Sequence, residues 1–185
     1  KMIGESTLLL ANEGPQPLPT PVLYLNPGLR VTALRGHDDE ELPYHRESQA
    51  IILQTPLQPG EETLVRVTYE GSIDEAVCFP DFTNEEFHDT RLRCFFRAYD
   101  SRFRHGRCFA RVGDNYTLLF PECLWYPVAI PPVNVNTPLA RQYDFTRYRL
   151  KVGDVGQRVA ISQGEMTTGG DTASFTNHQP LPSLT

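Results

Sequence analysis

The chain has 185 residues and a mass of 21.0 kDa, which is enough to bury one hydrophobic core, so we expect one main domain rather than two. A hydrophobic fraction of 39% with 22% charged residues excludes a disordered chain and a membrane-embedded one. The net charge of -6 argues against general attraction to nucleic acid, and no nucleic-acid partner is expected.

Residues 1–21 are predicted to be a linker or an extended lead-in. Proline fixes the backbone and donates no hydrogen bond, so a run of alternating prolines cannot form a central strand. Such a run is present at Pro15, Pro17, Pro19 and Pro21.

From residue 22 the chain changes to short apolar runs separated by turn residues. Strands are predicted at 22–25, 29–35, 50–53 and 63–69, with a turn at Asn26-Pro27-Gly28. In 29–35 the alternation places Val31 and Ala33 on one face and Leu34 on the other. Short turns between successive strands favour an antiparallel meander.

The second half repeats this pattern, with strands predicted near 143–152, 158–162 and 172–176. In the first of these, Tyr148, Leu150 and Val152 form one apolar row. Short strands at regular spacing indicate an all-β fold, an antiparallel β-sandwich over 22–185.

One segment departs from the strand pattern. A capping box at Thr83 and Glu86, followed by apolar residues on one helical face, predicts a short helix insertion at about 84–100. Alternation at 91–94 leaves a strand pair open as the other interpretation.

The cysteines and histidines carry no recognisable metal or catalytic pattern. No two of the four cysteines have the spacing of a zinc site, so buried thiols and one or two disulfides both stay open; the cysteines are Cys78, Cys94, Cys108 and Cys123. The chain also lacks HExxH, a nucleophile elbow and a phosphate loop. We therefore expect no enzyme activity, catalytic residue, metal or cofactor in this chain.

Arginine is concentrated in 91–111, where seven arginines accompany a single acid, Asp100. Such a block, mixed with aromatic residues, can bind phosphate groups or an acidic neighbouring domain. The alternative is pairing with the chain's own acidic runs at 38–41 and 85–86. The candidate interaction residues are Arg97, Arg102, Arg104 and Arg107.

Several phrases together resemble one known family. They are Tyr24–Val31 (YLNPGLRV), Pro56–Glu61 (PLQPGE), Tyr69-Glu70-Gly71, Leu124–Pro127 (LWYP) and Ala160–Gly164 (AISQG). In order and spacing they are similar to the N-terminal β domain of the aminopeptidase N family of zinc metallopeptidases, in the version fused to ABC-2 type transporter permeases. The resemblance covers most of 22–185.

The resemblance implies a fragment of a larger membrane-associated protein, with this soluble domain on the extracytoplasmic side. Its partners would be a downstream domain of the same polypeptide and membrane-embedded permease segments. The family's HExxH and Gly-x-Met-Glu-Asn motifs are absent here, so zinc would belong to the downstream domain.

We expect a non-catalytic accessory or interaction domain, with Trp125 and Tyr126 as candidate apolar contacts. A core position for Trp125 is the alternative. Two other functions stay open: a contribution to the active-site cleft of a zinc aminopeptidase in the full-length protein, and an extracytoplasmic ligand-binding module.

Overall fold

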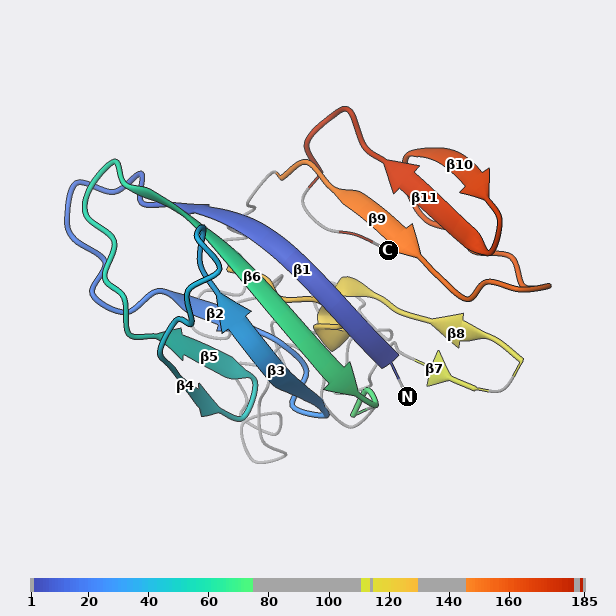
Figure 1. Cartoon of the computed structure of the whole chain (residues 1–185), viewed down its shortest axis with the longest axis horizontal. Coiled ribbons are helices and arrows are strands. Elements are labelled where there is room, and N and C mark those ends of the chain that lie inside the picture. The colour runs from blue at the N-terminus through green and yellow to red at the C-terminus, as the bar shows by residue number, and fades with distance from the viewer. Residues whose placement is uncertain (1, 75–110, 114, 130–145, 182–183, 185) are drawn as a thin grey trace, which may run out of the picture. The chain divides into compact units, whose positions relative to one another are not determined.

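The computed structural model describes residues 2–74, 111–113, 115–129, 146–181 and 184 (Figure 1). Its contacts divide the chain into two compact units, Lys1–Arg141 and Gln142–Thr185. This division differs from the single domain predicted for 22–185. The reason is that the strands described after residue 146 pair with one another and with no strand described before it.

In the described residues all strand pairings are antiparallel, which confirms the all-β prediction. The helix described is one 3-10 turn, η1 (Pro121–Cys123). The first unit contains β1 (Met2–Ala11), β2 (Val22–Tyr24), β3 (Leu29–Arg35), β4 (Tyr44–Glu47), β5 (Ala50–Leu53), β6 (Glu62–Gly71), β7 (Arg111–Val112) and β8 (Thr117–Leu118); the second contains β9 (Arg149–Val152), β10 (Glu165–Gly169) and β11 (Thr172–Thr176).

The described part of the first unit contains two three-stranded sheets, in the orders β1-β6-β3 and β2-β5-β4, and the two-stranded β7-β8 hairpin. The predicted meander is therefore wrong: β3 pairs with β6, and β5 pairs with β2 and β4. Alternation indicates which face of a strand is buried but not which strand lies beside it. Both sheets bury side chains in one core, including Leu23, Ile51, Val65 and Val67, each 0% exposed, which makes this unit sandwich-like.

The structure corrects the predicted lead-in over its first half. Residues Met2–Ala11 form β1, which pairs with β6 along its whole length, from Met2 opposite Gly71 to Ala11 opposite Glu62. The prolines constrain only the segment after the strand, where Leu18 makes one isolated bridge to Leu57.

A β-bulge changes the faces predicted for β3. Its register with β6 shifts between Val31 and Ala33, so that Leu34 is opposite Val67 and only 1% exposed. The prediction that Leu34 and Val31 lie on opposite faces is therefore wrong, because Val31 pairs with Tyr69 and Leu34 with Val67, two residues on one face of β6. One extra residue inverts the alternation of all residues that follow it.

The second unit is one sheet with the order β10-β11-β9. It confirms the strand at 172–176 and the half-buried row Tyr148, Leu150 and Val152. Residues 158–162 are not a strand; the third strand is β10, which starts at Glu165. The predicted helix at 84–100 lies outside the described residues.

No helix in the described ranges is long and apolar enough to cross a membrane.

Candidate functional site

The side chain of Asn26 is the centre of a buried polar junction in the first unit. It is 0% exposed and makes four hydrogen bonds to backbone groups. Its Nδ2 donates to the carbonyls of Asp74 (3.2 Å) and Cys123 (2.9 Å). Its Oδ1 accepts from the N–H groups of Gly28 (3.0 Å) and Asp74 (2.9 Å). One amide thus satisfies backbone groups from three separate segments of the chain.

The backbone around Asn26 holds the segment 120–128 in place. The Asn26 N–H donates to the Leu124 carbonyl at 2.8 Å, and Tyr24 and Val128 exchange two hydrogen bonds of 2.8 and 3.0 Å. Gly28 allows the close approach of the chain after β6, because a Cβ there would lie 2.1 Å from the Ser72 carbonyl oxygen. We call residues 24–28, 72–74 and 120–128 the Asn26 junction.

Arg46, on β4, makes hydrogen bonds to the backbone of the Asn26 junction. Its Nη2 donates to the carbonyls of Leu25 (2.8 Å) and Asn26 (3.1 Å), and its Nε to the carbonyl of Ser48 (2.6 Å). Burial lowers the pKa of the guanidinium, an effect that the nearby Tyr44 opposes. Arg46 therefore holds backbone carbonyls together and is tied into the junction.

Trp125 and Tyr126 lie on the same segment, and the structure places them mainly inside. Tyr126 is 8% exposed, and the half-buried Trp125 packs against the core. Their ring centroids are 4.7 Å apart with planes at 74°, an edge-to-face pair. In this unit their rings contribute to packing more than to the outer surface.

Exposed apolar side chains precede the junction on the β7-β8 hairpin. Val112, Tyr116 and Leu118 are 43%, 51% and 47% exposed. The chain runs from this hairpin directly into η1, so the exposed residues are attached to the segment that Asn26 fixes. These three exposed side chains form an apolar surface near the junction that is suited to contact with a neighbouring domain.

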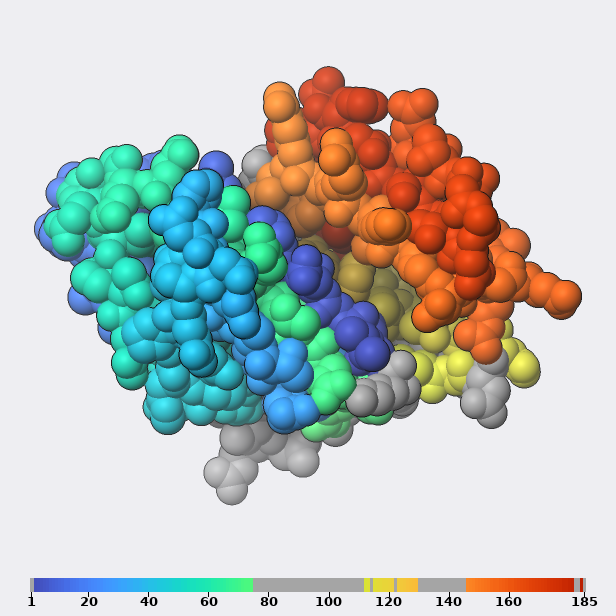
Figure 2. All heavy atoms as spheres, in the orientation of Figure 1, coloured from blue at the N-terminus to red at the C-terminus, as the bar shows by residue number. Residues whose placement is uncertain are grey.

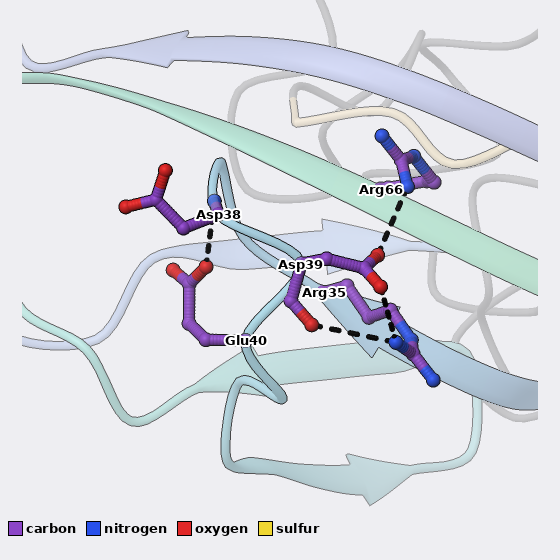
Figure 3. A network of polar contacts seen from close by, with 5 residues as sticks. All are labelled: Arg35, Asp38, Asp39, Glu40 and Arg66. Atoms are coloured by element: carbon purple, nitrogen blue, oxygen red, sulfur yellow. Dashed lines mark hydrogen bonds and ion pairs between the residues drawn. The ribbon is translucent and has the colours of Figure 1, made fainter.

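A second polar network lies on the first unit (Figure 3). Arg35 Nη1 is 2.7 Å from Asp39 Oδ2, and Arg66 Nη1 is 3.1 Å from Asp39 Oδ1. Asp39 has a φ of 64° in the turn after β3. One carboxylate therefore ties the turn to two strands of the sheet.

The other residues singled out in the sequence are not brought together here. Arg97, Arg102, Arg104, Arg107, Cys78, Cys94 and Cys108 lie outside the described residues. Cys123 is buried, and its Sγ is 2.9 Å from the Phe120 carbonyl oxygen. Within the described part of the chain no three His, Cys, Asp or Glu side chains gather to hold a metal ion.

No protein-family model matches the chain, and comparison with curated proteins gives no match. Solved structures do match. The M1 zinc metallopeptidase from Deinococcus radiodurans has a TM-score of 0.61 and 20% identity, over 97% of this chain and 35% of that chain. A two-domain M1 zinc metallopeptidase variant bound to L-arginine has a TM-score of 0.62 and 20% identity, over 97% of this chain and 35% of that one.

These likenesses show a shared fold, and the chain spans about a third of the length of the metallopeptidases that it matches.

Proposed function

We propose that the chain is a non-catalytic β domain of a larger zinc metallopeptidase-like protein, and that it packs against a neighbouring domain of the same polypeptide. The observation that carries this proposal is the pair of coverages, 97% of this chain against 35% of the Deinococcus radiodurans enzyme. The N-terminal β domain of the aminopeptidase N family, which the sequence phrases resemble, would account for both values.

The Asn26 junction gives this proposal a location. The phrase Tyr24–Val31 and the phrase Leu124–Pro127 are far apart in the sequence, yet hydrogen bonds join them at Asn26 and Leu124. The β7-β8 hairpin beside them exposes Leu118 and two other apolar residues. We place the contact with the neighbouring domain at this hairpin, with the junction as its rigid support.

The finer form of the proposal is the version of the family that is fused to ABC-2 type permeases. Its support is the sequence resemblance alone. In this form the parent protein is membrane-associated, this domain lies on the extracytoplasmic side, and zinc, where present, is bound by the downstream domain. Catalysis by this chain alone is not part of the proposal.

The test uses the parent polypeptide, in which we expect a downstream domain with HExxH. A Leu118→Asp variant of that polypeptide should lose protection from hydrogen exchange in both domains at their contact. Ile161→Asp, at an 87% exposed position of the second unit, serves as the matched control and should retain the protection. A parent without a metallopeptidase-like domain, or equal protection in both variants, would overturn the proposal.

If this domain also contributes to the active-site cleft of a zinc aminopeptidase in the full-length protein, Leu118→Asp should in addition change the KM for peptide substrates. Unchanged kinetics together with lost protection would leave a purely structural role.

A further inference from the structure

Among the strands that the structure describes, β1 lies at the edge of its sheet. The order β1-β6-β3 leaves one side of β1 next to β6, and no strand of the described chain pairs with its other side (Figure 1). With ten residues it is as long as β6, whereas β3, at the opposite edge, has seven. A long edge strand presents a row of N–H and C=O groups that can pair with another chain.

Within its own residues, β1 lacks the proline, the lysine and the bulge that often protect an edge strand. Met2–Ala11 contains no proline and no lysine, and its one charged residue is Glu5. Its register with β6 is uninterrupted, in contrast to the bulged β3. Two large apolar side chains, Ile3 and Leu9, are 75% and 65% exposed.

The side chains of β1 are accessible together with those of β6 on one face of the first unit (Figure 2). The more exposed positions of β1 are the odd-numbered ones, Ile3, Glu5, Thr7 and Leu9 among them. An added strand would continue this face, because paired residues in an antiparallel sheet point to the same side.

We propose that β1 pairs with β1 of a second copy of this chain, antiparallel and about a two-fold axis at Ser6. A two-fold axis normal to the sheet makes the contact self-complementary. With Ser6 opposite Ser6, Ile3 of each copy lies opposite Leu9 of the other. The two sheets then form one continuous six-stranded sheet.

The position of Glu5, the one charged residue of β1, favours this register over those with the axis one residue earlier or later. With the axis at Ser6, Glu5 lies opposite Thr7, and no like charges meet. With the axis at Glu5, the two carboxylates would lie directly opposite each other, which destabilises a strand pair. With the axis at Thr7, Glu5 would be opposite Leu9, and the Ile3–Leu9 contacts would be lost. A second copy thus fits the edge through the outward side chains of β1 itself.

The experiment is sedimentation equilibrium of the 185-residue chain at rising concentration. We expect a monomer–dimer equilibrium that weakens at least tenfold in Leu9→Lys and in Ile3→Glu, because each variant places charges opposite an apolar side chain. Ile161→Lys is the matched control at another exposed apolar position and should leave the equilibrium constant unchanged. Circular dichroism melting checks that each variant folds.

The double variant Ile3→Glu with Leu9→Lys tests the register itself. The axis at Ser6 places the carboxylate of Ile3→Glu opposite the ammonium group of Leu9→Lys twice, so the dimer should recover to within about threefold of the original. A monomer at every concentration overturns the proposal, and so does a dimer that Ile161→Lys disrupts. A double variant no better than the single ones overturns the register. Each outcome is independent of the proposed metallopeptidase-like parent.

Discussion

Arg35 and Arg66 lie directly opposite each other on β3 and β6. Like charges in this position destabilise an antiparallel pair, and here both guanidinium groups share the carboxylate of Asp39 (Figure 3). The bulge between Val31 and Ala33 creates the arrangement, because it shifts the register by one residue and sets Arg35 opposite Arg66. The Asp39 turn therefore offsets a repulsion that the bulge introduces.

Replacement of Asp39 by asparagine should expose this repulsion. Asparagine tolerates the positive φ of the turn, so the change removes mainly the charge. We expect a loss of about 0.5–1 kcal/mol at low ionic strength, since all three groups are partly exposed. The loss should shrink as salt is raised, because salt screens the two arginines. Urea unfolding at two salt concentrations measures both effects.

Asp38→Asn is the matched control for Asp39, because the Asp38 backbone N–H, not its carboxylate, makes the hydrogen bond in this turn. An equal loss in both variants would contradict the shared-carboxylate explanation.

Removal of the Asn26 side chain should lower the free energy of unfolding more than the change at Asp39 does. Asn26→Ala leaves up to four buried or part-buried backbone groups without their partner, and each unsatisfied buried group costs about 1–3 kcal/mol before the structure relaxes. We expect a total loss of about 3–5 kcal/mol in urea unfolding. Asn115→Ala, at an exposed position, should change stability by less than about 0.5 kcal/mol. Similar losses in the two variants would contradict a central role for Asn26.

Substitution of Leu34 tests whether β3 contains the β-bulge between Val31 and Ala33. The structure buries Leu34 and leaves Leu64 half-buried on β6. Leu34→Ala should therefore cost about 2–5 kcal/mol, and Leu64→Ala less than about 1.5 kcal/mol. Denaturant unfolding compares them directly. If Leu34→Ala were the milder change, β3 would have the uninterrupted alternation that its sequence predicts.

The buried phenol of Tyr69 should make the folded chain lose stability at high pH. Burial raises the pKa of its phenol above the ordinary value of 10.0, and the hydrogen bond with Ser6 opposes this only in part. Above about pH 10 the unfolded chain releases this proton more readily than the folded one, so stability is complete below that pH and falls as pH rises through the folded pKa. Tyr69→Phe should show a smaller fall between pH 9 and 11 in urea unfolding, and an equal fall would refute the assignment.

Sequence patterns predict the structure best in strands that pack one face against the core. The alternation at 63–69 separates Val65, Val67 and Tyr69 from Leu64, Arg66 and Thr68, and the structure buries the first three together on one face of β6. Alternation failed at Leu34, since a bulge depends on the partner strand and leaves no mark in the periodicity of its own strand. The sequence does not reveal β1, because the prolines at 15–21 indicate an extended lead-in while the strand precedes them at Met2–Ala11.

The candidate site was less predictable than the strands. Asn26-Pro27-Gly28 predicts a turn, and a turn forms there, but the same residues do not reveal that the Asn26 side chain is buried. Its partners Asp74 and Cys123 come from distant parts of the chain, and local patterns carry no information about them. Arg46 was missed for the same reason: its acceptors are backbone carbonyls, which every sequence has.

The span of the Asn26–Cys123 hydrogen bond has a consequence for how the protein is made. The two residues are 97 positions apart, so this contact closes a long loop at a high entropic cost and forms after more local structure. During synthesis the strands up to β6 emerge well before Cys123 does, and until then the Asn26 amide can bond only Gly28 and Asp74, while the donor that pairs with Cys123 is solvated by water. The first unit is therefore completed only after the 120–128 segment has been synthesised and reaches its place at the ends of β2 and β6.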